Sequence, residues 1–187
     1  MGNILYIDAT VRRDSRTAVL ARFLLSRLEG NIETVRLIDW DFPAVNESYL
    51  TKRSADSAAG TLGNYPLAKQ FAAADTVVIA APYWDLSFPA RLKQYFELIN
   101  VIGVTFAYNA EGKAYSLCRA KKLYYLTTAG GKILSDAYGF GYVQALSDYF
   151  YKIPECVQFK AECLDLPGTD IQSTLNAIKA EIERAVP

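Results

Sequence analysis

Residues 75–96 read DTVVIAAPYWDLSFPARLKQYF, and this stretch decides the fold. It opens with the apolar, β-branched run 76–81, whose length and composition are typical of a strand buried on both faces of a parallel sheet. Pro82 ends the run, and from Pro89 the apolar residues recur at helical spacing. Proline suits the first turn of a helix, where its missing N–H costs nothing. The stretch therefore predicts a buried strand, a short loop and a helix.

The loop between this strand and this helix carries two large aromatic residues, Tyr83 and Trp84. In open α/β sheets, ligands bind in the crevice outside the carboxyl ends of the strands, which is where this loop is expected. Its aromatic surface and its backbone N–H groups suit a flat heteroaromatic ligand. Aromatic residues are also common in protein cores, so the stretch alone equally allows the two rings to cap the core.

The composition predicts one globular domain spanning residues 1–187. Hydrophobic residues make up 51% of the chain and charged residues 21%, as is ordinary for such proteins. Lys+Arg and Asp+Glu both number 20, so no net charge favours a nucleic acid or an anionic membrane as a partner. The sequence has neither an apolar run near the ~20 residues of a membrane span nor a basic-then-apolar leader. We therefore expect a cytoplasmic protein with no membrane or nucleic-acid partner.

The cysteine and histidine content limits the chemistry that the side chains can perform. Cys118, Cys156 and Cys163 are odd in number and lack metal-ligand spacing, which indicates reduced thiols and no metal site. The chain contains no histidine, which excludes His-based triads, His-ligated metals and His general acids. Any chemistry must therefore depend on other residues or on a cofactor.

A second candidate loop lies between the predicted strand 4–7 and a helix whose apolar stripe runs from Val19 to Leu28. Its hydroxyl and guanidinium side chains are Thr10, Arg12, Arg13, Ser15, Arg16 and Thr17. Hydroxyl groups, arginines and a helix N-terminus together can bind a phosphate monoester. The loop matches neither the P-loop nor the dinucleotide glycine motif. An N-capped helix with solvated arginines explains the segment equally well.

A third candidate loop, 127–131, follows the predicted strand 121–127 and ends in two glycines, which let backbone approach a ligand closely. The connection 39–64 is polar and irregular, and a connection of this length usually carries function or a local helix. The other expected elements are strands at 33–37 and 157–161, an extended segment at 101–108, a turn at 109–112, and helices at 66–74, 142–151 and 171–185.

Strands that alternate with helices predict an α/β fold with three layers. Its centre is a doubly wound five-stranded parallel sheet in the flavodoxin-like order 2-1-3-4-5. In that order the first, third and fourth strands are neighbours, and the topological switch point lies between the first and the third. The three candidate loops follow these strands, so we expect them to surround one crevice.

The sequence resembles the flavodoxin-like NAD(P)H-dependent quinone and azo reductases, also called FMN-dependent azoreductases. The resemblance runs from Ile4 to about Leu166, and its most specific segments are 81–93, 103–108 and 127–131, together with the helix start 15–17. It implies FMN bound at the interface of a homodimer and a ping-pong hydride mechanism. NADH or NADPH would reduce the flavin, and a quinone, azo or nitro compound would take the electrons. The preferred electron donor and the physiological acceptor stay open.

The same resemblance implies which residues hold the cofactor. The residues expected at the FMN phosphate are Thr10, Ser15 and Thr17, with Arg12 or Arg16. Those expected against the isoalloxazine ring are Pro82, Tyr83, Trp84, Asp85 and Leu86. Gly130 and Gly131 are expected at its pyrimidine edge, and Thr128 and Ala129 complete the set. No side chain is expected to be catalytic, because the flavin carries the chemistry.

The Asp85 carboxylate and the aromatic residues of the loops lead to two further expectations. Many relatives have an asparagine where Asp85 stands. The Asp85 carboxylate either points to solvent or to Arg91, or it faces the flavin.

Aromatic residues are enriched in interface cores. The aromatic residues expected at the dimer interface are Trp84, Phe88, Phe106, Tyr108 and Tyr138.

Other classes of function fit less well. A flavin-binding redox-sensing accessory subunit without catalytic activity is the main alternative. A one-electron carrier is less favoured, because carriers are often strongly acidic and this chain has no net charge. A phospho-receiver domain needs an aspartate where the third strand ends, but that strand ends in Ala80, Ala81 and Pro82. FAD is less favoured than FMN, because no segment is evident that would bind an adenosine.

Overall fold

A computed structural model of the chain, which describes residues 2–186, is organised around a five-stranded sheet with the order β2-β1-β3-β6-β7. Its strands are β1 (Asn3–Asp8), β2 (Asn31–Arg36), β3 (Thr76–Ala80), β6 (Lys122–Thr128) and β7 (Glu155–Ala161). All four neighbouring pairs are parallel. Because β6 and β7 are the fourth and fifth strands of this sheet, the predicted order 2-1-3-4-5 is confirmed.

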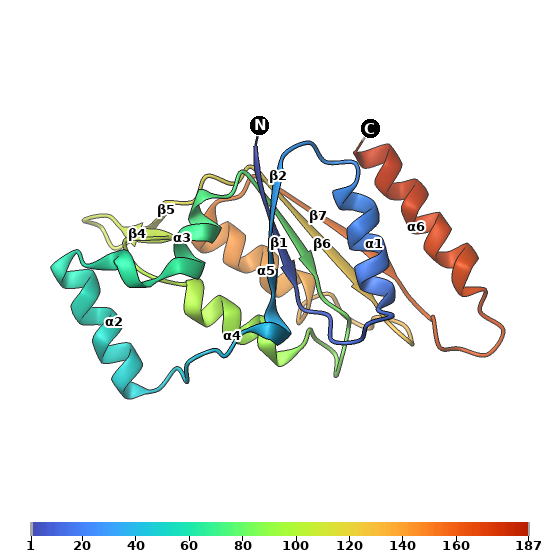
Figure 1. Cartoon of the computed structure of the whole chain (residues 1–187), viewed down its shortest axis with the longest axis horizontal. Helices are drawn as coiled ribbons and strands as arrows, with labels where there is room; N and C mark the ends of the chain where they lie inside the picture. The colour runs from blue at the N-terminus through green and yellow to red at the C-terminus, as the bar shows by residue number, and fades with distance from the viewer. Residues whose placement is uncertain (1, 187) are drawn as a thin grey trace.

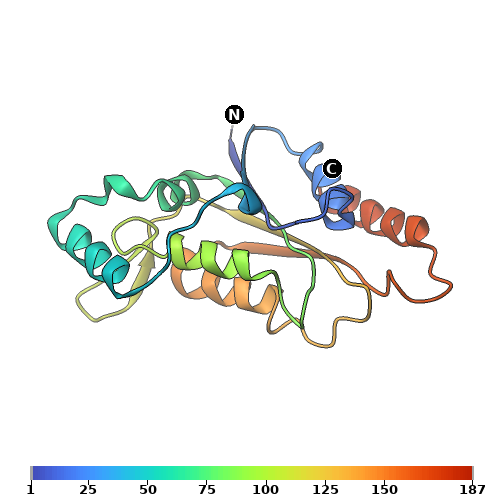
Figure 2. The same cartoon turned by 60° about the horizontal axis from the view of Figure 1, so that its bottom comes forward.

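Helices cover both faces of the sheet, which gives the three layers that the sequence predicted (Figures 1 and 2). On one face lie α1 (Arg16–Leu25) and α6 (Ile171–Ala185). On the other face lie α3 (Pro66–Ala73), α4 (Ala90–Ile99) and α5 (Phe140–Leu146). The helix α5 continues into the π-helical turn η3 (Ser147–Tyr151), so the helix expected at 142–151 is present with a widened last turn.

The central strand β3 contributes to two hydrophobic cores, one on each face. Val77 and Ile79 belong to the core beneath α3, α4 and α5, whereas Val78 and Ala80 belong to the core beneath α1 and α6. This alternation follows from the two-residue period of a strand. All four residues are fully buried, as expected from the continuous apolar run. Strand β3 therefore ends, and releases its loop, at the middle of the carboxyl edge of the sheet.

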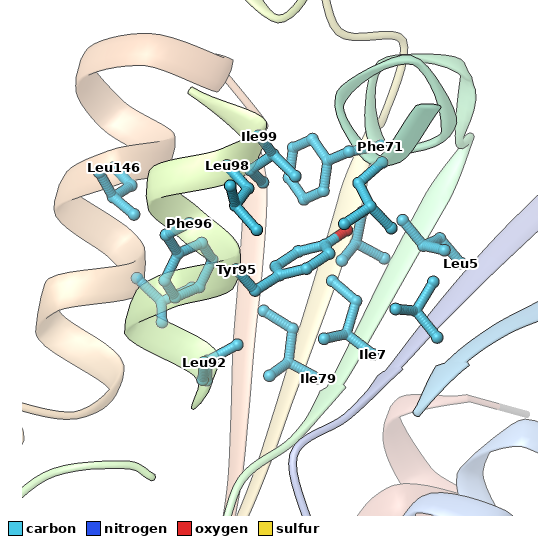
Figure 3. Close-up of a cluster of buried hydrophobic side chains, with 14 of the residues drawn as sticks. Leu5, Ile7, Phe71, Ile79, Leu92, Tyr95, Phe96, Leu98, Ile99 and Leu146 are labelled. Carbon is cyan, nitrogen blue, oxygen red and sulfur yellow. The ribbon is translucent and has the colours of Figure 1, made fainter. Parts of the chain in front are cut away.

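Tyr95 anchors α4 to the sheet. Figure 3 shows its ring directed from α4 toward the strands, with Phe71 on one side and Ile7 and Ile79 on the other. The side chain is fully buried, and burial raises the pKa of its hydroxyl far above the usual range. Burying an aromatic side chain of this size stabilises the fold by roughly 1.5–3 kcal/mol. The packing fixes α4, and with it the loop that enters this helix.

The connection 39–64 carries a local helix, one of the two possibilities that its length indicated. The helix is α2 (Glu47–Ala59), which ends at Gly60 with φ 70°, and the short turns η1 (Leu37–Asp39) and η2 (Leu62–Asn64) lie on either side of it. The segment expected to be extended at 101–108 is shorter, and forms β4 (Phe106–Tyr108), which pairs with the unexpected β5 (Ala114–Ser116) as an antiparallel hairpin. Figure 1 shows α2 and this hairpin at the opposite end of the molecule from α6. None of the helices within residues 2–186 is both long enough and apolar enough to cross a membrane.

Candidate functional site

A cavity of about 300 Å³ opens at the carboxyl edge of the sheet, where the loops after β1, β3 and β6 converge. The predicted site residues that line it are Arg12, Ser15, Arg16, Thr17, Pro82, Tyr83, Trp84, Thr128, Ala129 and Gly130. Four further predicted residues belong to the same loops but do not line the cavity: Thr10, Asp85, Leu86 and Gly131. The structure therefore brings together the three loops that the sequence singled out.

The loop after β1 presents the N-terminus of α1 to this cavity. Ser15 is the N-cap, and its Oγ accepts a hydrogen bond from the Ala18 N–H at 3.2 Å. Asp8 shapes the start of the loop, because its Oδ1 accepts from the Thr10 N–H at 2.9 Å. The N–H groups of Arg16 and Thr17 make no hydrogen bond within residues 2–186. Free N–H groups at the positive end of a helix form an anion-binding site.

Thr17 and Thr128 join this helix to the end of β6. Their Oγ1 atoms lie 2.7 Å apart, and either hydroxyl can donate. Thr17 is fully buried and Thr128 is partly buried. The hydroxyl that accepts this hydrogen bond keeps its own proton, which is free to donate to a ligand in the cavity.

Two arginines and two acidic residues give the cavity its charge. Arg12 and Arg16 line it together with Asp14 and Asp165. Arg16 Nη1 donates to Asp165 Oδ1 at 2.7 Å and to the Leu164 carbonyl at 3.3 Å. One of the two cations is thus already engaged with an acidic partner.

The loop after β3 forms a tight two-residue turn. The backbones of Trp84 and Ser87 exchange two hydrogen bonds of 2.8 Å, and the residues between them, Asp85 and Leu86, have φ values of 48° and 67°. This is the geometry of a type I′ turn, which usually carries asparagine and glycine, so Leu86 adopts a backbone conformation that is rare for its side chain. The N–H groups of Asp85 and Leu86 have no acceptor in the described part of the chain. The Ser87 hydroxyl donates to the Tyr138 carbonyl and so fastens this loop to the one after β6.

Of the arrangements left open for the Asp85 carboxylate, exposure to solvent is the one observed, and pairing with Arg91 is not. The Asp85 side chain is exposed, and it forms no ion pair with any residue from 2 to 186. Arg91 instead donates to the Trp40 carbonyl at 3.4 Å, and its guanidinium lies 5.5 Å from the centre of the Phe42 ring. Cation–π contact with the buried Phe42 ring holds Arg91 away from the turn.

The two glycines of the loop after β6 differ in their surroundings. A Cβ atom on Gly130 would lie 2.3 Å from Asp165 Oδ2, so only glycine fits there unless Asp165 moves. The Gly131 position has open space around it, and no close contact explains the glycine. The Gly130 carbonyl accepts from the Asp165 N–H at 2.9 Å, and the Ala129 carbonyl accepts from the Leu164 N–H at 3.1 Å. These bonds hold the segment after β7 against the glycine loop.

Four residues that line the cavity were missed from the sequence: Val11, Asp14, Leu164 and Asp165. Val11 and Asp14 lie between predicted residues of the first loop, and their types carry no signal of their own. Leu164 and Asp165 come from a fourth loop, after β7. The predicted strand order places β7 beside β6, so this loop could have been expected at the same edge of the sheet.

The aromatic residues expected at an interface divide into two groups. Phe88 and Phe106 are buried in the monomer, with 9% and 5% of their surface exposed, and the expectation of a surface role is wrong for both. Trp84, Tyr108 and Tyr138 are 40%, 44% and 63% exposed. These three are therefore available for contacts with another molecule.

A flavin mononucleotide fits this arrangement chemically. The α1 N-terminus and Arg16 suit its phosphate, Gly130 leaves room for close approach, and the free N–H groups of the turn after β3 suit the polar edge of a ring. A doubly wound sheet whose cavity combines these features at the switch point defines a flavodoxin-like protein of the nucleotide-binding type.

Comparisons with known proteins agree with this class. A family model described as flavodoxin-like fold matches residues 2–161. An FMN-dependent NADH:quinone oxidoreductase from Clostridium beijerinckii is 32% identical, and the match covers 94% of this chain and 93% of the relative. A second such protein, from Clostridium acetobutylicum, is 32% identical over 99% of this chain and 98% of its own length.

Solved structures with the same fold include two azoreductases of Bacillus anthracis. One aligns with a TM-score of 0.83 at 20% identity and covers 100% of this chain and 99% of its own. The other is an FMN-dependent NADH-azoreductase in complex with FMN, with a TM-score of 0.79 at 20% identity and full coverage of both chains. The chain belongs to the flavodoxin-like family and, within it, to the FMN-dependent NADH:quinone oxidoreductases. This confirms the resemblance seen in the sequence.

Proposed function

We propose that this protein is an FMN-dependent oxidoreductase that passes two electrons from NADH to a quinone or azo compound. The observation that carries the proposal is the 32% identity to FMN-dependent NADH:quinone oxidoreductases along almost the whole chain. The cavity at the sheet edge supports it, because it joins an anion-binding helix end to an aromatic loop. No observation favours the alternative of a flavin-binding accessory subunit without activity.

The first loop and the start of α1 would hold the FMN phosphate. Arg12, Ser15, Arg16 and Thr17 all line the cavity, and the N–H groups of Arg16 and Thr17 have no partner within residues 2–186. Several charge-assisted hydrogen bonds to one phosphate are strong enough to retain a cofactor. Thr10 belongs to the same loop but supports it from outside the cavity.

The loops after β3 and β6 would hold the isoalloxazine ring. Pro82, Tyr83 and Trp84 from the loop after β3 line the cavity, together with Ala129 and Gly130 from the loop after β6. The turn at Asp85 and Leu86 lies beside these residues and offers its N–H groups to the ring. When bound, the flavin accepts a hydride equivalent from the nicotinamide and passes two electrons to the acceptor. The protein supplies position and hydrogen bonds, and no histidine is available for proton transfer.

We further propose that the protein is a cytoplasmic homodimer in which each chain forms one domain. Exposed aromatic residues support the dimer, because such residues are enriched in interface cores. Trp84 lines the cavity, Tyr138 lies in the loop that Ser87 contacts, and Tyr108 and Tyr115 belong to the β4–β5 hairpin. Light scattering of the full-length protein tests this proposal. A monomer that keeps its full activity on dilution would contradict it.

Steady-state kinetics with purified, FMN-loaded protein test the enzymatic proposal. Without oxygen, NADH should be oxidised beyond one equivalent per flavin only when a quinone is present. Initial rates at several fixed quinone concentrations should give parallel double-reciprocal lines, as expected for a ping-pong reaction. Flavin-free protein is the matched control and should be inactive. FMN binding without any NADH oxidation would favour the accessory subunit instead.

A further inference from the structure

Asp165 is an acidic residue placed inside the candidate phosphate site. Its Oδ1 accepts from Arg16 Nη1 at 2.7 Å, and its Oδ2 lies over Gly130, 2.3 Å from where a Cβ would be. Arg16 is its one ionic partner among residues 2–186, and the Asp165 side chain is 68% exposed to the cavity and solvent. The carboxylate thus spans from the first residue of α1 to the glycine loop.

Arg16 is also the cation best placed to receive a phosphate. It is the first residue of α1, where the N–H groups of Arg16 and Thr17 are unengaged. A phosphate monoester carries close to two negative charges at neutral pH. An arginine has five N–H donors and can meet two anions, but the two anions then lie within a few ångströms of each other and repel.

We propose that Asp165 competes with the flavin phosphate for Arg16, and thereby lowers the affinity for FMN and keeps the cofactor exchangeable. The inference rests on the proposed function, because it takes FMN as the ligand of this cavity. The competition acts on the phosphate and not on the ring. Asp165 therefore sets how strongly the protein prefers FMN over riboflavin, which has the same ring but no phosphate.

The experiment measures the affinity of the flavin-free, full-length protein for FMN and for riboflavin by quenching of flavin fluorescence. The variant Asp165→Asn keeps the shape of the side chain and can still accept a hydrogen bond from Arg16, but it carries no charge. Glu183→Gln is the matched control. It removes a carboxylate from another arginine pair, that with Arg27 at 3.5 Å, which does not line the cavity.

We expect Asp165→Asn to bind FMN about tenfold more tightly than the wild type at low ionic strength, the effect of one exposed charge at roughly 6 Å from a phosphate dianion in water. Riboflavin binding should change by less than about twofold, and Glu183→Gln should match the wild type for both flavins. The gain for FMN should shrink in about 0.5 M salt, because exposed charges are then screened.

Unchanged FMN affinity in Asp165→Asn would overturn the inference. Weaker binding of FMN alone would overturn it as well, and would show that Asp165 holds Arg16 in place for the phosphate. An equal change for FMN and riboflavin would overturn it by locating the effect at the ring or the ribityl chain. If the wild type bound neither flavin, the proposed function would fail as well as the inference. If the wild type binds FMN but the Asp165→Asn variant behaves otherwise than expected, only the inference fails.

Discussion

Ser15 has two roles in this structure, and two substitutions separate them. As the N-cap of α1 it accepts a hydrogen bond from the Ala18 N–H, and as a cavity residue it faces the proposed phosphate. Ser15→Ala removes both roles. Ser15→Gly removes the hydroxyl but keeps a residue that caps helices almost as well. Loss of a hydrogen bond to a charged group costs roughly 1.5–3 kcal/mol, which corresponds to a roughly 10- to 100-fold weaker affinity for FMN.

Both variants should therefore bind FMN roughly 10- to 100-fold more weakly, by fluorescence titration of the flavin-free protein. Only Ser15→Ala should lose about 1 kcal/mol of unfolding free energy in urea without flavin, because alanine is a poor cap whereas glycine costs a few tenths. Asn46→Ala is the matched control: it removes the cap of α2, where Asn46 Oδ1 accepts from the Tyr49 N–H at 3.0 Å, and should leave FMN affinity unchanged. Wild-type FMN affinity in both Ser15 variants would refute the phosphate assignment.

Three further changes test the local structure around the site. Thr17→Val should cost about 1–3 kcal/mol of unfolding free energy, because the partly buried hydrogen bond to Thr128 is lost. An equal urea midpoint in variant and wild type would show that the bond contributes nothing. Leu86→Gly should raise the free energy of unfolding by about 0.5–1 kcal/mol. Glycine relieves the strain of the left-handed backbone at φ 67°, and its greater freedom in the unfolded chain offsets part of that gain. Leu86→Ala should give no gain. Hydrogen bonds from Gln158 and Lys160 lower the pKa of Asp136, so this carboxylate should stabilise the fold above its unfolded pKa of about 3.9 and lose that contribution as the pH falls through its lower folded pKa. Urea midpoints across pH should then show Asp136→Asn to be less stable than the wild type near neutrality and equal to it in strong acid, and a constant difference would contradict the linkage.

The sheet could be predicted from the sequence because each strand carries its own signal. The run 76–81 is continuous and β-branched, and the structure buries it on both faces. The helix α2 could not be predicted from an apolar stripe, because the sequence 47–59 is mostly polar. In agreement with this, no residue of α2 is buried. Its start and end depend on the local cap at Asn46 and on the left-handed Gly60, which are short-range signals without a periodic pattern between them.

The candidate site was predictable where one loop carries several polar or aromatic residues, and not where a contact depends on two distant segments. Ser15 and Thr17 follow from the hydroxyl-rich first loop. The pairing of Arg16 with Asp165 joins residues 149 positions apart, and no local pattern announces it. The same holds for the contact of Arg91 with the Phe42 ring, which joins residues from two separate segments of the chain.

The most direct test of the account is a two-step anaerobic mixing experiment with the FMN-loaded protein. The account predicts that NADH alone bleaches the visible absorbance of the bound flavin, and that a quinone added in the second step restores it with about one quinone consumed per flavin. Flavin absorbance that NADH leaves unchanged, or that a quinone fails to restore after NADH has bleached it, would contradict the claim that this chain is an NADH:quinone oxidoreductase.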